Sequence, residues 1–180
     1  MELLDIVDEN NNLTNKVIDR EIVHKEGLWH REVAVIILNK EGKMLLEKRA
    51  PTKKQSPNKW ALCAGHIEAG DIPENAIVRE MKEEIGVKVS IDELDFLKVA
   101  KRDIKFNNEQ YNRAFQYTYY WLTDKKESDF TVQIEELTEV KFFDLKDIKN
   151  AVKDKDRNYA FANEEYIDEI LNLAEEKIKK

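Results

Sequence analysis

One segment of the chain reads Gly65-His-Ile-Glu-Ala-Gly70-Asp-Ile-Pro-Glu-Asn-Ala-Ile-Val-Arg79-Glu80-Met-Lys-Glu83-Glu84-Ile-Gly86-Val87. A proline in the first turn and a glycine just past the end predict a helix over residues 73–85. On such a helix Glu80, Glu83 and Glu84 fall within about 100° of one another, beside an apolar stripe. The segment therefore predicts three carboxylates held side by side at the edge of a core.

These three carboxylates indicate a metal site. Like charges at that spacing destabilise an isolated helix by about a few tenths of a kcal/mol per pair. A divalent cation removes the repulsion, and Mg²⁺ typically takes one or two carboxylates together with substrate phosphate oxygens. Arg79 precedes Glu83 by one turn and can orient its carboxylate. The alternative is a solvated charged face, which the pattern from Arg79 to Glu84 alone also fits.

Length and charge restrict the class of protein. The chain has 180 residues, with 30 Lys and Arg against 37 Asp and Glu, a formal net charge of −7. This length predicts one domain, and no apolar run approaches the roughly 18 residues of a membrane span. Residues 1–9 lack the basic-then-apolar order of a signal peptide, and the single cysteine, Cys63, predicts a cytoplasmic protein without a disulfide. The acidity disfavours bulk nucleic acid and anionic membranes as partners.

Apolar patterns and turn residues predict an α+β domain over residues 1–180. We expect an N-terminal hairpin extension (1–29, strands at 2–7 and 16–23), a core (30–150) and a C-terminal helix (151–180) capped by Asn163. Core strands are expected at 33–38, 43–49, 60–64, 94–102, 113–122 and 139–143, with a helix capped by Asp144 near 144–152. In the strand at 113–122, aromatic residues alternate, which is typical of a half-buried strand. The last helix has an apolar stripe of Ile167, Ile170, Leu171, Ala174 and Ile178.

The segment from Gly65 to Val87 resembles the signature of the Nudix hydrolases. That signature is Gly, five residues, Glu, seven residues, and then Arg-Glu-apolar-x-Glu-Glu-x-Gly-apolar. Asp71 stands where the signature has its first Glu, and every other position matches in register. The resemblance covers about residues 30–150 and implies an α/β/α sandwich with a mixed central sheet. It also implies attack of water on a diphosphate linked to another group, assisted by Mg²⁺ or Mn²⁺.

The resemblance assigns roles to individual residues. Glu80, Glu83 and Glu84 are expected to bind the metal, with the Gly65 carbonyl as a further ligand. Glu83, Glu84 and Arg79 then belong to the catalytic set.

The general base varies within the family and often lies in a loop before the last strand. Glu136 is the candidate here, and Glu135 and Glu139 are its rivals. The basic segment 43–59 supplies Arg49 and Lys59 as candidates for holding substrate phosphates. An ordinary solvated basic loop is the alternative.

A second resemblance is to the isopentenyl-diphosphate-isomerase-like branch of the family. It rests on residues 2–8 and 24–30, Lys48-Arg49, Trp60 and Gly65-His66. In the isomerase, two upstream histidines and one in a Cys-Gly-His motif help to bind a metal. His24, His30 and His66 fall in that pattern here, and both metal binding and simple packing remain open for them.

The same comparison favours hydrolysis over isomerisation. Ala64 occupies the position of the isomerase's catalytic Cys, and Cys63 lies one residue away, on the opposite face of a strand. Cys63 is therefore expected to be a small buried apolar residue. The isomerase's Glu pair on a later strand is also missing, because the stretch from Phe115 to Tyr119 contains no carboxylate.

Together these patterns predict a Mg²⁺-dependent Nudix hydrolase. We expect it to cleave the diphosphate linkage of a nucleoside diphosphate derivative, with that small molecule as its partner. The alternatives are an isopentenyl-diphosphate isomerase and a non-catalytic nucleotide-binding protein with the same fold. The N-terminal hairpin and the C-terminal helix could also serve a homodimer.

Overall fold

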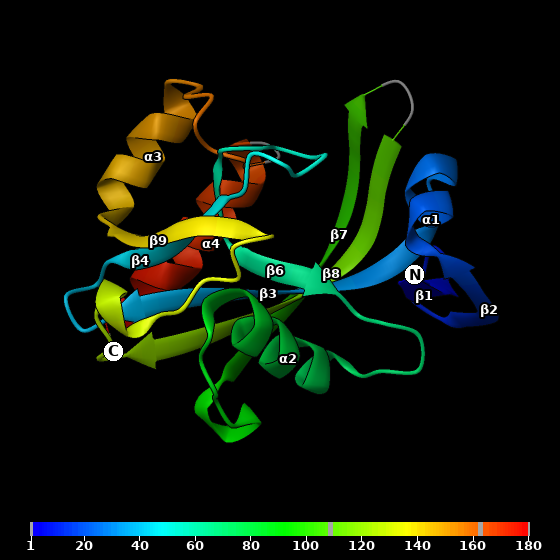
Figure 1. Ribbon diagram of the computed structural model, residues 1–180, viewed down its shortest axis with the longest axis horizontal. Coiled ribbons are helices and arrows are strands. Elements are labelled where there is room, and N and C mark those ends of the chain that lie inside the picture. Colours follow the sequence, from blue (N-terminus) through cyan, green and yellow to red (C-terminus); the bar gives the residue numbers. More distant parts are fainter. Residues whose placement is uncertain (1, 108–109, 162–163, 180) are drawn as a thin grey trace.

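A mixed sheet of seven strands forms the middle layer of the molecule (Figure 1). The computed structural model describes residues 2–107, 110–161 and 164–179. Its sheet strands are β3 (Trp29–Asn39), β4 (Met44–Arg49), β5 (Trp60–Ala61), β6 (Cys63–His66), β7 (Asp95–Asn107), β8 (Gln110–Thr123) and β9 (Leu137–Phe143). β3 is parallel to β8 and antiparallel to β4 and β6, while β7 pairs with β8 and both β5 and β9 pair with β4.

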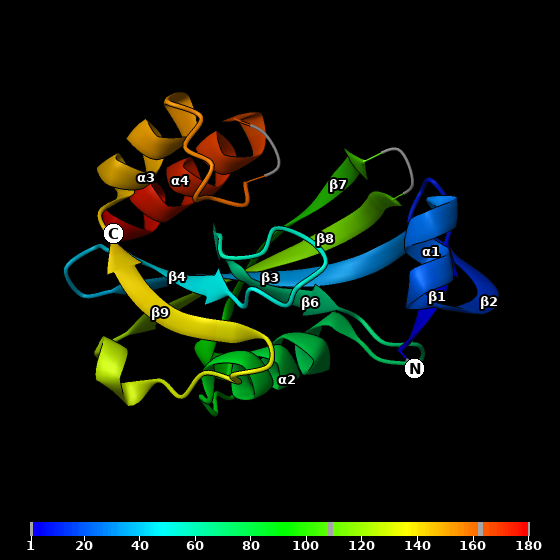
Figure 2. The same cartoon turned by 45° about the horizontal axis from the view of Figure 1, so that its top comes forward.

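Helices cover both faces of this sheet (Figure 2). One face packs on α2 (Pro73–Ile85), and the other packs on α3 (Leu145–Lys153) and α4 (Glu164–Ile178). Alternate residues of β3 serve the two cores, with Val35 and Ile37 toward α2 and Ile36 toward α4. A strand that is apolar on both faces requires two covering layers. The predicted α/β/α sandwich is confirmed.

Burial of β8 differs from the sequence prediction. Tyr119 and Trp121 lie in the α2-side core as expected, but Thr118 and Tyr120, which alternate with them, are also at most 8% exposed. The aromatic alternation predicted a strand with one face exposed to solvent. That inference was wrong because α4 covers the second face, where Tyr120 packs with the apolar residues of the helix.

The N-terminal extension is a hairpin followed by a short helix. β1 (Leu3–Val7) pairs with β2 (Leu13–Asp19), and α1 (Arg20–Glu26) follows directly. The prediction of a strand over 16–23 was therefore wrong from residue 20 onward. Asp19 caps α1 by accepting a hydrogen bond from the backbone N–H of Glu21, and Gly27 ends it at φ 65°. Both are standard helix signals, overlooked because the apolar residues Ile22 and Val23 continue the strand pattern.

Helix α2 has the predicted bounds, and its C-terminus positions the loop that precedes β9. Gly86 ends the helix with φ 71°, a conformation that favours glycine. The backbone N–H groups of Thr131 and Gln133 donate to the carbonyls of Ile85 and Glu84. The loop that carries Glu136 is thus anchored to the helix that carries the glutamates.

Three smaller differences complete the fold. The strand expected at 60–64 is divided into β5 and β6 at Leu62. Asp144 caps α3 without a side-chain hydrogen bond, and the predicted cap Asn163 lies outside the described residues. The stripe of α4 is buried except for Ile178, which is 48% exposed. The described part of the chain also contains short 3-10 turns at Ile91–Glu93 and Glu127–Asp129, and none of its helices is both long and apolar enough for a membrane span.

Candidate active site

A cavity of about 470 Å³ opens where α2, the loop 50–59, residues 160–161 and Tyr166 of α4 meet. Most of the residues singled out from the sequence line it: Arg49, Gly65, Arg79, Glu80, Glu83, Glu84 and Glu136. Lys59 is not among the lining residues, and Lys53, which the sequence reasoning did not select, is. The volume lies in the range of small-molecule sites.

Gly65 leaves room for the carboxyl group of Glu80. A β-carbon at position 65 would lie 2.1 Å from Glu80 Cδ and 2.2 Å from Oε1, far inside contact distance. Glu80 is only 9% exposed. Burial, and then the charge of Glu84, raise the pKa of its carboxyl to about 7 against the opposing effect of Arg79. A cation bound beside this buried carboxyl group would favour its ionised form.

Arg79 connects α2 to β6. Its guanidinium donates to the carbonyl of His66 at 2.9 Å and lies 2.8 Å from Glu80 Oε1. It also lies 3.3 Å from Oε2 of Glu83, whose side chain is 53% exposed. Arg79 thus contacts the carboxyl groups of both Glu80 and Glu83.

Glu84 lies deeper, beside a residue that the sequence reasoning missed. Ligand atoms of Glu47, Cys63 and Glu84 all lie within 4.8 Å of one another, and all three residues are buried. Cys63 is 4% exposed, so its predicted burial is confirmed, but two carboxyl groups are among its neighbours. Burial, and then the charge of Glu84, raise the pKa of Glu47 well above its usual value. The available signal was Glu47 itself, the one acid in the basic segment 43–59.

Basic side chains line another part of the cavity. Arg49 donates through Nε to the carbonyl of Gln55 at 3.1 Å, which holds the loop 50–59 against β4. Lys53 forms an ion pair with Glu136 and is only 18% exposed at its side chain. The rival bases Glu135 and Glu139 are both exposed and do not line the cavity. Of the three candidates for the base, Glu136 alone lies in the cavity wall.

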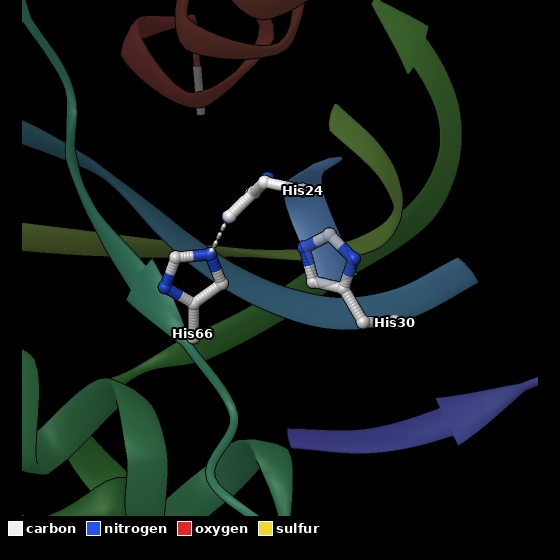
Figure 3. Close-up of side chains that lie close together, drawn as sticks. All are labelled: His24, His30 and His66. Atoms are coloured by element: carbon white, nitrogen blue, oxygen red, sulfur yellow. Dashed lines mark hydrogen bonds between the residues drawn. The ribbon is translucent and has the colours of Figure 1, made fainter. Parts of the chain in front are cut away.

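The three histidines meet beside this cavity, from α1, β3 and β6 (Figure 3). His24 Nε2 lies 3.0 Å from His66 Nε2, and one ring nitrogen from each of the three histidines lies within 4.8 Å of those of the other two. The Nδ1 atoms of His24 and His30 lie 2.8 Å and 3.1 Å from backbone carbonyls, and Nδ1 of His66 lies 3.1 Å from Glu2 Oε1. A proton on each Nδ1 leaves the Nε2 lone pairs free to face one another, the arrangement found in metal sites.

Glu32 supplies a carboxylate to this histidine cluster. Its Oε1 lies 3.6 Å from His30 Nε2 and 3.7 Å from His66 Nε2, and the Asn112 amide donates to it at 2.8 Å. Burial alone would raise the pKa of Glu32, but His30, His66 and Arg102 lower it far below its usual value. Burial also lowers the pKa of His24 to about 4. Three imidazoles together with a carboxylate are a ligand set that suits Zn²⁺ and related ions.

Comparisons with known proteins show the family of the chain. Residues 28–163 match the NUDIX domain family. A Nudix hydrolase of Clostridium acetobutylicum is 31% identical over 140 residues. The matched part is 76% of this chain and 66% of that relative. A prenyl-diphosphate phosphatase of Methanosarcina mazei is 31% identical over 82% of this chain and 83% of its own. A crystal structure from Deinococcus radiodurans has the same fold, with a TM-score of 0.71, 20% identity and coverage of 93% of this chain and 98% of that one.

The fold, the glutamate-lined cavity and these relatives define a Nudix hydrolase, a class of enzymes that cleave diphosphate linkages, and the chain belongs to that family. Within it, the chain is related to the isopentenyl-diphosphate isomerases. The example from Photorhabdus laumondii is 35% identical over 47% of this chain and 48% of its own.

Proposed function

We propose that this protein hydrolyses the diphosphate linkage of a nucleoside diphosphate derivative, with the help of Mg²⁺ or Mn²⁺. One observation carries the proposal: the carboxyl groups of Glu80 and Glu84 are buried in the wall of a cavity that Arg49 and Lys53 also line. Acidic side chains suit a hard divalent cation, and the adjoining basic side chains suit phosphate oxygens.

The described residues fit such a cation. Oxygen Oε2 of Glu84 is buried with no hydrogen-bond partner in the described part of the chain, and Gly65 leaves Glu80 the space it occupies. Glu80, Glu83, Glu84 and the Gly65 carbonyl would hold the ion. When bound, it would neutralise phosphate charge and lower the pKa of a water molecule.

The protein's own groups would position the reactants. Arg79 holds Glu80 and Glu83 in place through its guanidinium. Arg49 and Lys53 would bind the diphosphate. Lys53 would thus take the role that the sequence suggested for Lys59. Glu136 would accept the proton of the attacking water, after the substrate draws Lys53 away from it.

Polar side chains favour a nucleoside over a hydrocarbon as the group linked to the diphosphate. Beyond the glutamates, the cavity is lined by Arg102, Asn112, Gln116 and Gln133, which can donate hydrogen bonds to a base or a sugar. The second candidate is a prenyl diphosphate. It is favoured by the Methanosarcina mazei relative and by the apolar side chains of Leu62, Phe106 and Phe161 in the cavity wall.

A substrate screen tests the proposal. Nucleoside di- and triphosphates, nucleotide sugars, ADP-ribose, dinucleotides and prenyl diphosphates would each be incubated with Mg²⁺ or Mn²⁺, and the phosphate-containing products measured. Glu83→Gln should lose activity, whereas Glu74→Gln, an exposed glutamate on the same helix, should keep it. Turnover of prenyl diphosphates alone would favour the second candidate. Absence of product from every compound, with Glu83→Gln indistinguishable, would refute hydrolysis.

Isomerisation of isopentenyl diphosphate has less support. Ala64 lines the cavity where the isomerase has its catalytic cysteine, and the thiol of Cys63 is not among the lining groups. A direct assay for interconversion of the two five-carbon diphosphates tests this alternative, and absence of interconversion would exclude it. A third alternative, binding without turnover, predicts tight nucleotide binding and no product even with Mn²⁺.

We further propose that the histidine cluster (His24, His30, His66) holds a transition-metal ion, with Glu32 as a carboxylate neighbour. The close approach of one ring nitrogen from each histidine supports this role. Elemental analysis of the purified protein tests it: His66→Ala should contain about one Zn²⁺ or similar ion per chain fewer than the wild type. If the purified protein contains no metal and takes up none on dialysis against Zn²⁺, the three histidines only pack against one another.

Cellular location and assembly remain predictions. The lone buried Cys63 suits a reducing cytoplasm. The apolar stripe of α4 and the hairpin β1–β2 both pack within the chain, so a homodimer would have to use their remaining faces; sedimentation measurements test this.

A further inference from the structure

Glu47 is an unusually placed acid. It lies on β4 between Leu46 and Lys48 and is only 2% exposed. Both of its carboxyl oxygens are buried, no N–H or hydroxyl group of the described residues donates to them, and the group that faces them is another acid, Glu84. A buried carboxyl group without a partner is strongly unfavourable, so the site must supply a proton or a cation.

The neighbours of Glu47 are themselves ligand groups. Glu84 adds a third buried oxygen, Oε2, to which no N–H or hydroxyl group of the described chain donates, and Cys63 adds a sulfur. One ligand atom from each of the three lies within 4.8 Å of the others. Two carboxylates and a thiolate at that spacing can surround one ion without any change of backbone.

We propose that Glu47, Cys63 and Glu84 form a second cation position beneath the one held by Glu80, Glu83 and Glu84. This inference rests on the proposed function, because Glu84 belongs to both sets. Its carboxylate would bridge two ions, and paired ions can stabilise both the attacking and the leaving oxygen of a displacement. The sulfur ligand makes the deep position selective for transition metals such as Mn²⁺, Co²⁺ or Zn²⁺ over Mg²⁺.

Cobalt provides a test that reports on this position alone. Cys63 is the only cysteine in the chain, so a sulfur-to-Co²⁺ charge-transfer absorption can arise only from an ion bound there. The intact protein would be stripped of metal and titrated with Co²⁺. We expect the band in the wild type and in Glu83→Gln, which lacks a ligand of the upper position only. Cys63→Ser should abolish the band, as the control for its origin.

Glu47→Gln is the decisive variant, because it keeps the shape of the side chain and removes the charge. We expect the Co²⁺ affinity measured from the band to fall by about 10-fold or more, the range for losing a group that supports a metal. Glu47→Asp keeps the charge and should retain a weaker band. In EDTA, Glu47→Gln should melt no lower than the wild type, because it removes a buried acid, and Co²⁺ should raise its melting temperature less.

Each outcome has a clear meaning. A wild-type protein saturated with Co²⁺ but without the band, or a band of unchanged affinity in Glu47→Gln, would overturn the inference and leave a shared proton between Glu47 and Glu84. If Glu83→Gln abolishes hydrolysis while Glu47→Gln leaves the band unaltered, only the deep position fails. If no substrate is hydrolysed but the band behaves as expected, the hydrolase proposal fails and the metal position stands.

Discussion

Replacement of Gly65 by alanine is the sharpest test of how the glutamate site is built. The added β-carbon would lie 2.1 Å from Glu80 Cδ, whereas ordinary contact begins at 3.4 Å. The carboxyl group must therefore retreat by about 1.3 Å, while metal–ligand distances are held to about 0.2 Å. Backbone strain plays no part, because Gly65 is not among the glycines with positive φ.

Three quantities should change in Gly65→Ala: the free energy of unfolding, kcat and the Mg²⁺ affinity. Overpacking should lower the free energy of unfolding by about 1–3 kcal/mol. A 1 Å misplacement at a catalytic site can cost about 10²-fold in rate, so kcat should fall by that order while Mg²⁺ affinity weakens. Thermal melting, calorimetric titration with Mg²⁺ and turnover of the best substrate from the screen measure the three effects.

The double variant Gly65→Ala/Glu80→Asp separates packing from metal binding. The shorter acid restores space beneath residue 65, so stability should recover, but its carboxylate is set back and activity should stay low. If Gly65→Ala bound Mg²⁺ and turned over substrate as well as the wild type, Glu80 would not need its observed position. The explanation of why residue 65 is a glycine would then be wrong.

Three other predictions follow from the site. The pKa of Glu80 is raised to about 7, so ionisation of its carboxyl group destabilises the metal-free fold. The free energy of unfolding, measured by urea titration, should therefore fall by up to about 3 kcal/mol as the pH rises from about 4.5 through 7 and beyond. Saturating Mg²⁺ should remove this loss. Lys53→Gln should lower kcat/KM by about 10- to 100-fold through a lost charged hydrogen bond to phosphate, whereas the exposed neighbour change Lys54→Gln should have little effect; equal kinetics would remove Lys53 from the site. Gly86→Ala should destabilise the fold by about 1–3 kcal/mol, because its β-carbon would lie 2.6 Å from the Thr131 carbonyl; unchanged melting would contradict this account of the α2 terminus.

Local signals accounted for the helix that carries the glutamates. Pro73 and Gly86 mark its two ends, and the predicted bounds are those observed. Such signals act within a few residues and do not depend on the rest of the chain. The buried strand β3 was also predictable, because its unbroken apolar run requires cover on both faces.

Features that depend on distant parts of the chain were not predictable in this way. The burial of Glu47 results from its meeting Glu84, on a helix far along the sequence, and nothing in the local pattern of β4 reveals that contact. Glu32 was passed over for the same reason, because its partners His66, Arg102 and Asn112 come from other strands. Likewise the choice of Lys53 over Lys59 depends on how the loop 50–59 folds back onto Glu136.

The attachment of the N-terminal extension has a consequence for the dynamics of the protein. Its own apolar cluster is small, with Leu4, Ile6 and Val23 buried, and an isolated two-stranded hairpin is marginally stable. It is held to the core by a β-bridge between Leu4 and Glu68 and by the contact of His24 with His66. Opening this extension would pull His24 out of the histidine cluster. If the histidine cluster binds the proposed ion, amide hydrogens of residues 3–26 should exchange with solvent more slowly in the metal-loaded protein, because opening of the extension would break the bond between His24 and the ion.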